Sequence, residues 1–246
     1  MGKPITQSRR EVEAAIEKAN TLISIAPEAL ADVIVENTNK GFLKYVREPL
    51  GVSYIIAPWN RPISDPMGVI IVSILAGNTV CLKHSAVTPL SGKFYEKAFQ
   101  SAGVNIVRDV MSTPAVSEVL FKMPQLGFLY FSGSQKAGHI IQEQTAEVSF
   151  LQAIYEVGGK DAAYVAEDAD LQLAVEKIMH GAFYNNGQIS SATERIYVTQ
   201  SLYDEFLDRA AKVVKTFKIG DPMNEDTFLG PLASREIVDR LSKQVK

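Results

Sequence analysis

The order of apolar and polar positions divides the chain into a first helical segment and a long alternating series. Apolar residues recur at helical spacing between positions 12 and 23, directly after Ser8 and Glu11, which match the pattern of a capping box. This pattern predicts a helix from Ser8 to about Ala26. The polar stretch 38–48, which contains a glycine, then predicts a loop or a hairpin.

From residue 50 onward, short continuous apolar runs alternate with amphipathic segments. The runs predict strands that are buried on both faces, and the segments predict helices with one apolar face. Strands are predicted over 52–57, 79–83, 104–110 and 127–131, and helices over 65–75, 89–102, 115–121 and 135–146. This alternation predicts an α/β fold with a doubly wound, Rossmann-like parallel sheet that helices cover on both sides.

The alternation continues in the second half of the chain. Strands are predicted over 153–157, 162–166 and 195–199, and helices after 168, from 201 and over 234–246. Asp168 is the expected cap of a helix that ends at Asn185-Asn186-Gly187, where each residue tolerates the left-handed backbone conformation. We therefore expect a Rossmann-like dinucleotide-binding domain over residues 1–155 and part of an α/β catalytic domain over residues 156–246.

Composition narrows the function classes. The 246 residues are 46% hydrophobic and 22% charged, as in an ordinary globular protein. The net charge of -3 offers no basic face for nucleic acid or for an anionic membrane. No apolar run approaches the roughly 20 residues of a membrane span. We therefore expect neither nucleic acid nor a membrane as a partner.

Cysteine and histidine usage adds two further expectations. The single cysteine, Cys81, excludes an internal disulfide framework and fits a reducing compartment, so a cytoplasmic location is expected. Cys81 lies within a predicted strand, where a small buried thiol is the ordinary interpretation. The three histidines show no ligand spacing, so no metal site is expected.

Several short segments that border or connect the predicted strands and helices carry glycine, proline or charged residues. In chain order they are Glu48-Pro-Leu-Gly-Val, Ile56-Ala57-Pro58-Trp59-Asn60, Leu75-Ala-Gly-Asn-Thr-Val-Cys-Leu-Lys83, Phe131-Ser-Gly133-Ser134, Glu156-Val-Gly-Gly-Lys160, Gly187-Gln-Ile-Ser190 and Leu229-Gly-Pro-Leu. In this order and at this spacing they resemble the aldehyde dehydrogenase superfamily, and the resemblance covers essentially the whole chain. Members of that family are roughly twice as long, so the chain is expected to be an internal portion of such a protein.

Two of these segments can be interpreted from their residues alone. Lys83 ends a predicted strand and can place an ammonium in the crevice at the carboxyl edge of a parallel sheet, where such folds bind nucleotides. Gly133 and Ser134 open a predicted helix, whose first backbone N–H groups suit a pyrophosphate. Without the resemblance, a solvated lysine and a plain serine cap are the commoner interpretations.

The resemblance implies a cofactor, NAD or NADP. It implies that Lys83 contacts the adenosine ribose and that Gly133 and Ser134 meet the pyrophosphate. It also places at the cofactor four residues at the end of the predicted strand 52–57 and directly after it, and two residues beyond Lys83: Ile56, Ala57, Pro58, Trp59, Ser85 and Ala86. Family members that prefer NAD often carry Glu where this chain has Ala86. Because a missing carboxylate spares a 2′-phosphate from repulsion, we expect NADP or mixed use.

The resemblance also implies catalytic roles. In the family, a cysteine thiolate attacks an aldehyde, hydride passes to the nicotinamide, and water releases the carboxylic acid. Position 190 matches the nucleophile, the Asn60 amide and the backbone N–H of residue 190 match the oxyanion donors, and Glu156 matches the general base. On its residues alone, Asn60 is more simply a turn residue after Pro58 and Trp59. Glu156 is otherwise a surface carboxylate, an interpretation that its apolar neighbours Tyr155 and Val157 weaken.

Ser190 departs from the family pattern, which has cysteine. A serine hydroxyl needs an adjacent base, and the loop contains no histidine to supply one. We therefore expect aldehyde oxidation to be lowered by orders of magnitude. Three hypotheses stay open: an aldehyde-oxidising enzyme, a non-catalytic relative that binds dinucleotide or pairs with a full-length paralogue, and a structural fragment without a role of its own.

The expected shortening bears on partners as well. The family's C-terminal side supplies a Glu-x-Phe-Gly-Pro motif and oligomer-forming strands, and neither is found in this sequence. We expect a sheet edge and a helix face to be exposed as a result. A second copy of the chain is then a further candidate partner.

Overall fold

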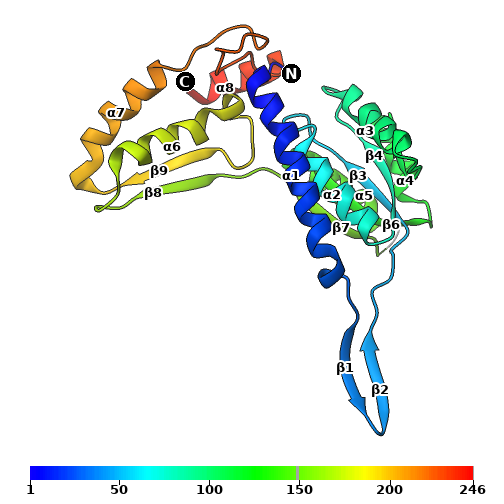
Figure 1. The fold of residues 1–246 in the computed structure, drawn as a ribbon. Helices are drawn as coiled ribbons and strands as arrows, with labels where there is room; N and C mark the ends of the chain where they lie inside the picture. The colour runs from blue at the N-terminus through cyan, green and yellow to red at the C-terminus, as the bar shows by residue number, and fades with distance from the viewer. Residues whose placement is uncertain (148–149, 246) are drawn as a thin grey trace. The chain divides into compact units, whose positions relative to one another are not determined.

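The computed structural model describes residues 1–147 and 150–245. Backbone contacts divide the chain into two compact units, and Figure 1 traces both. The larger unit is Glu11–Val157, and the smaller unit combines Met1–Arg10 with Gly158–Lys246. The roles expected for residues 1–155 and 156–246 stay predictions.

The first helix, α1 (Ile5–Ala29), starts earlier and ends later than the sequence predicts. Ser8 does not cap it, because Ser8 lies inside the helix. Its hydroxyl donates to the carbonyl of Pro4, one turn earlier in the chain, at 3.1 Å. Pro27 lies inside the last turn, so the helix passes beyond Ala26. The expected capping box and the expected end are therefore both wrong.

The larger unit is built on a parallel sheet of five strands in the order β5-β4-β3-β6-β7. Its strands are β3 (Val52–Ile56), β4 (Thr79–Lys83), β5 (Val107–Asp109), β6 (Leu126–Ser132) and β7 (Gln152–Glu156). The joining helices are α2 (Ser64–Leu75), α3 (Pro89–Ser101), α4 (Pro114–Phe121) and α5 (Gln135–Ala146). The chain begins in the middle at β3, builds one side through β5, and returns to build the other. The predicted doubly wound α/β fold is thus confirmed.

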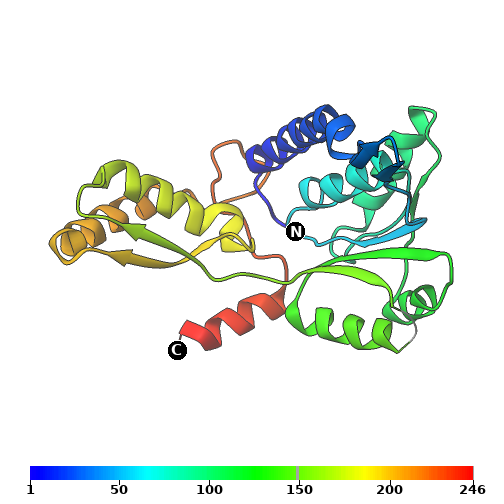
Figure 2. The same ribbon diagram turned by 90° about the horizontal axis from the view of Figure 1, so that it is seen from below.

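Alternate residues of the central strand supply the two cores of this unit. Ile55 packs with Ile70 of α2 and Tyr95 of α3 on one face. Tyr54 packs with Phe121 of α4 on the other face. Figure 2 shows helices on both sides of the sheet. Full burial of an aliphatic or aromatic side chain stabilises a fold by about 1.5–3 kcal/mol, so both faces hold the sheet.

The polar stretch around residue 40 is a hairpin, one of the two predicted alternatives. Strands β1 (Val33–Thr38) and β2 (Gly41–Tyr45) pair antiparallel, and every residue of both strands is exposed. The hairpin (Figure 1) begins before the predicted stretch, because Val33, Ile34 and Val35 form the first half of β1.

The smaller unit contains a two-stranded parallel sheet of β8 (Asp161–Val165) and β9 (Thr193–Val198). Its helices are α6 (Leu171–Phe183), the short η1 (Tyr184–Gly187) and η2 (Gln200–Leu202), α7 (Tyr203–Lys215) and α8 (Arg235–Val245). Val175 and Met179 of α6 pack against Phe206 and Ala210 of α7. The apolar stripes of these two helices therefore form the core of the unit.

The two ends of α6 test the sequence analysis in detail. Asp170, not Asp168, caps its start, and the Asp170 carboxylate accepts from the Leu173 N–H at 3.1 Å. The predicted terminator is confirmed, because Asn185, Asn186 and Gly187 all have positive φ, at 51°, 59° and 70°.

One glycine of the central sheet offers a direct test of packing. A Cβ on Gly127 of β6 would lie 1.9 Å from the Leu50 carbonyl oxygen, whereas one on Gly41 would meet nothing within 4 Å. We predict that Gly127→Ala lowers the free energy of unfolding by about 1–3 kcal/mol through overpacking. Gly41→Ala, the control, should change it by less than about 0.5 kcal/mol. Equal urea midpoints for the two variants would contradict this packing.

Candidate functional site

The carboxyl ends of the central strands form one edge of the sheet in the larger unit. The strand register pairs Ile56 with Lys83 on one side and with Phe131 on the other, and it pairs Ser132 with Glu156. The segment from Ala57 to Asn60 directly follows β3. The fold thereby brings the predicted cofactor residues to one edge, where the strand order also reverses.

Lys83 ends β4 on the face that α4 and α5 cover, because it alternates with Cys81, which packs on that face. Its side chain is half-buried, and burial lowers the pKa of its ammonium. A partly desolvated cation is a stronger partner for hydroxyl or phosphate oxygens than one in bulk water. The position therefore suits a polar, oxygen-rich ligand.

The start of α5 lies at the same edge. Ser134 caps the helix by accepting from the Ala137 N–H at 3.3 Å, and its side chain is exposed. The first N–H groups of a helix have no acceptor within it, so they remain available to an anion. A Cβ on Gly133 would lie 2.7 Å from the Phe131 ring. The backbone before α5 therefore passes close to this ring, and glycine suits the position. These residues fit a pyrophosphate.

The other predicted cofactor residues differ in what they expose. Ile56, Ala57 and Pro58 are buried, so a ligand at this edge would meet their backbone, whereas Trp59 is half-buried. Beyond Lys83, the hydroxyl of Ser85 accepts from the Val87 N–H at 3.3 Å. Ala86 is exposed in the same turn.

Asn60 lies in the turn that joins β3 to α2. Its side-chain oxygen accepts from the Arg61 N–H at 3.0 Å, which orients the amide. The start of α2 has no side-chain cap of its own. Instead, the buried carboxylate of Glu11 accepts from the N–H groups of Ile63 and Ser64 at 2.9 and 3.0 Å. The sequence did not reveal this role of Glu11, because no local pattern signals a contact across 52 positions.

Glu156 is the last residue of β7, and its side chain is exposed. By alternation it shares a sheet face with Ser132 and Tyr130. Burial, followed by the charges of Asp65 and Glu156, raises the pKa of the Tyr130 hydroxyl to about 12. The Glu156 carboxylate thus contributes to the raised pKa of Tyr130. Its role as a general base stays a prediction.

Ser190 belongs to the smaller unit and is exposed. Its loop is held by a buried side chain near the N-terminus: Gln7 accepts from the Asn185 N–H at 2.9 Å and donates to the Phe228 carbonyl at 2.8 Å. A Cβ on Gly159 would lie 2.2 Å from the Ser190 carbonyl oxygen. The backbone at position 159 therefore passes so close to the Ser190 loop that only glycine fits there.

The segment after Phe228 also holds the loop. Asn186 donates from its side chain to the Gly230 carbonyl, and the Gln188 side chain accepts from the Ala233 N–H at 3.1 Å. Leu229-Gly-Pro-Leu is therefore an anchor of the predicted nucleophile loop, a role that the sequence did not reveal.

The structure groups the predicted site residues in two sets. Asn60, Lys83, Ser134 and Glu156 belong to the larger unit, and Ser190 belongs to the smaller one. The first set shares the carboxyl edge of the sheet. The predicted pairing of Asn60 with the backbone N–H of residue 190 stays a prediction.

Comparison with known proteins decides the ancestry. Residues 1–246 match the aldehyde dehydrogenase family. The chain belongs to this family. A 1-pyrroline-5-carboxylate dehydrogenase of Geobacillus sp. is 30% identical over 257 residues, which cover 100% of this chain and 49% of the relative.

Two solved structures of the family share the fold of this chain. A succinic semialdehyde dehydrogenase from Streptococcus pyogenes, in complex with NADP+, has a TM-score of 0.92 and 29% identity, covering 99% of this chain and 53% of its own. An NAD-dependent aldehyde dehydrogenase from Sinorhizobium meliloti has a TM-score of 0.93 and 28% identity, covering 99% and 49%. The chain thus spans about half the length of the relatives it matches.

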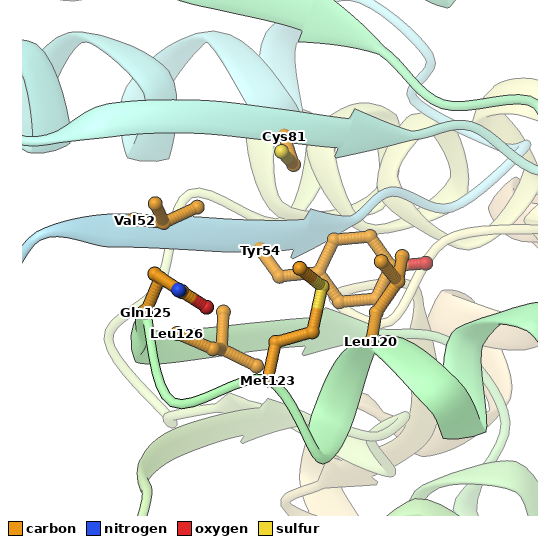
Figure 3. A pocket seen from close by; sticks show the side chains of 7 residues that line it. All are labelled: Val52, Tyr54, Cys81, Leu120, Met123, Gln125 and Leu126. Carbon is orange, nitrogen blue, oxygen red and sulfur yellow. The ribbon is translucent and has the colours of Figure 1, made fainter.

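A cavity in this chain of the aldehyde dehydrogenase family lies away from the carboxyl edge of the sheet. It has a volume of about 140 Å³ and lies at the start of β3 and β6. Figure 3 shows the side chains that line it, which are Val52, Tyr54, Cys81, Leu120, Met123, Gln125 and Leu126. Cys81 is only half-buried because it borders this cavity, so the expected buried thiol is wrong in degree. Burial nonetheless raises the pKa of the thiol, which makes it a poor nucleophile.

Over residues 1–147 and 150–245, no three His, Cys, Asp or Glu side chains gather closely enough to hold a metal ion. In the same described residues, no helix combines the length and apolar character that a membrane crossing needs.

Gln7 provides the test of how the Ser190 loop is held. We predict that Gln7→Leu, which keeps the side-chain volume, lowers the free energy of unfolding by about 1–3 kcal/mol, because the Asn185 N–H and the Phe228 carbonyl lose their partner. Amide exchange at Asn185 should accelerate.

The control is Arg9→Ala, two residues away, which removes an exposed ion pair with Glu225. It should change the free energy of unfolding by less than about 0.5 kcal/mol. Unchanged exchange at Asn185 in the Gln7→Leu variant would contradict the anchoring role.

Proposed function

We propose that this chain binds NAD(P)+ along the carboxyl edge of its five-stranded sheet. The observation that carries the proposal is the register that brings Lys83, the segment after Ile56 and the start of α5 to one edge, at the point where the strand order reverses. Doubly wound sheets bind nucleotides at this place. One structural relative carries NADP+ and another is NAD-dependent, which supports the choice of ligand.

The residues of this edge have complementary roles in the proposed binding. Lys83 donates hydrogen bonds to the hydroxyl groups of the adenosine ribose. The first N–H groups of α5, with the Ser134 hydroxyl, bind the pyrophosphate through hydrogen bonds and the positive end of the helix dipole. The backbone of Ile56 and Ala57 lines the same edge. The exposed Ala86 adds no charge beside the ribose.

We further propose that the reaction class is oxidation of an aldehyde to a carboxylic acid. The bound dinucleotide supplies the hydride acceptor. The Asn60 amide donates to the oxygen of the aldehyde as negative charge develops there, since its own oxygen is already held by the Arg61 N–H. Glu156 accepts a proton from the water that releases the acid. Residue 190 is the nucleophile.

Ser190 limits this reaction. A thiol near pKa 8.5 is a few per cent thiolate at neutral pH, whereas a serine hydroxyl needs a base to become nucleophilic. The loop from Tyr184 to Ala192 contains no histidine. We therefore propose slow oxidation as the primary function of the chain.

A second candidate function follows from the same residue. Without a reactive nucleophile, the chain serves as a dinucleotide-binding protein or as a partner of a full-length paralogue. Nucleotide binding without aldehyde-dependent reduction of NAD(P)+, even after a cysteine is restored at position 190, would favour this candidate.

Ser190→Cys is the direct test of the nucleophile. We predict that it raises aldehyde-dependent NAD(P)H formation by orders of magnitude, with a rate that increases with pH toward about 8.5 as the thiolate forms. The matched control is Ser191→Cys, a neighbouring exposed serine, which should leave the rate at the level of the parent chain. Equal rates for the two variants would rule out residue 190 as the nucleophile.

The choice between the two dinucleotides tests Ala86. We predict that NADP+ binds at least as tightly as NAD+, and that Ala86→Glu weakens NADP+ binding several-fold more than NAD+ binding through repulsion of the 2′-phosphate. Ala86→Gln, similar in size but uncharged, should alter both equally little. A calorimetric Kd for NAD+ about tenfold or more below that for NADP+ in the parent chain would contradict this preference.

A further inference from the structure

The turn between β3 and α2, residues 60–64, is held by side chains from three separate elements. Glu11 of α1 accepts from the N–H groups of Ile63 and Ser64. The Tyr95 hydroxyl of α3 donates to the Ile63 carbonyl. The ring of His84, which follows β4, bonds the Pro62 carbonyl through Nε2 at 2.9 Å. The polar backbone of this turn is therefore tied to the surrounding elements at three consecutive residues.

The His84 ring has one defined arrangement. A carbonyl can only accept, so Nε2 carries the proton and Nδ1 accepts from the Thr88 hydroxyl at 3.2 Å. The residue is only 7% exposed, and burial lowers its pKa, so the neutral ring predominates at neutral pH. With both nitrogens bonded and the ring packed, His84 cannot turn independently of its backbone.

His84 also lies between two residues assigned to the cofactor. Lys83 precedes it and Ser85 follows it, so the backbone that presents both is fixed by the same buried ring. On its other side the ring holds Pro62, two residues after Asn60. Glu11 and Tyr95 fix the later part of the turn. His84 is the side chain that joins the end of β4 to Pro62, and beside it the Ala57 N–H donates to the Lys83 carbonyl at 2.9 Å.

We propose that His84 is a positioning residue that couples nucleotide binding at Lys83 and Ser85 to the placement of the turn bearing Trp59 and Asn60. This inference rests on the proposed function of the carboxyl edge. A ligand that shifts the backbone at residues 83–85 shifts the ring, and the ring shifts Pro62. Nucleotide binding at Lys83 and Ser85 thereby changes the position of Asn60, the residue proposed to bind the aldehyde oxygen.

The chain contains a built-in reporter of this coupling. Trp59 is its only tryptophan and lies next to Asn60, so the tryptophan fluorescence of the chain comes from this segment. The probes are AMP and adenosine 2′,5′-bisphosphate, which represent the adenosine end of the dinucleotide and lack the nicotinamide half. Calorimetry measures their binding, and the shift and acrylamide quenching of Trp59 emission measure the response of the turn.

Three variants isolate the His84 contacts. His84→Phe keeps a planar ring and removes the donor to Pro62. His84→Gln keeps a side-chain N–H that can replace it. Thr88→Val removes the partner of Nδ1 without altering the ring, and it serves where His84→Phe does not fold. The control is Tyr54→Phe, which loses hydrogen bonds to Ser112 and Ser117 on the opposite face of the sheet.

We expect the bound probe to alter Trp59 emission in the parent chain. His84→Phe should still bind the probe and lose most of that response, Thr88→Val should lose part of it, and His84→Gln and Tyr54→Phe should retain it. Probe binding with the same Trp59 response in the parent, His84→Phe and Thr88→Val proteins would overturn the coupling alone. A parent chain that binds neither probe and neither dinucleotide would overturn the proposed function and the coupling with it.

Discussion

The alignment of parallel strand ends is the constraint on which the rest of the structure depends. Because β3, β4, β6 and β7 run in one direction and pair nearly in step, four chain segments far apart in sequence end at a single edge. Main-chain hydrogen bonds fix this register, and the alternating side chains of β3 fasten it to helices on both faces. A one-residue slip of β3 would turn Tyr54 and Ile55 toward the wrong layers, and a one-residue slip of β4 would move Lys83 to the opposite face. The site therefore inherits its geometry from the core.

Polar groups beside this edge are satisfied by distant partners. The turn after β3 would leave carbonyl and N–H groups without partners inside the fold, at a cost of about 1–3 kcal/mol for each buried group. Glu11, His84 and Tyr95 meet that demand from three other elements. In the smaller unit, Gln7 does the same for the loop of Ser190. Both candidate catalytic segments are thus irregular backbone held by buried side chains.

The sequence predicted the parts that depend on local pattern. Continuous apolar runs located all the strands of the central sheet, and Asn185-Asn186-Gly187 marked a left-handed helix end. Local pattern failed where two similar signals compete: Asp168 and Asp170 both suit a helix cap, and only packing selects the second. It failed at Ser8 because the helix begins one turn earlier, after Pro4.

Long-range contacts could not be predicted from one sequence. Gln7 and Asn185 are 178 positions apart, and nothing near either residue signals the other. The candidate nucleotide residues were named through resemblance to the aldehyde dehydrogenases, and the geometry supplies an independent reason for the choice, since they meet at one sheet edge. Ser190 is a different case. Its place in the loop is defined, but the chemistry of a hydroxyl there depends on a base that the loop does not contain.

The carboxyl edge of this sheet is the proposed binding site of the dinucleotide. A crystal structure of the chain grown with NADP+ tests it most directly. We expect density for the adenosine ribose against Lys83 and for the pyrophosphate at the N-terminus of α5 beside Ser134. A dinucleotide bound elsewhere on the molecule, or crystals that never take it up at saturating concentration, would rule out this site.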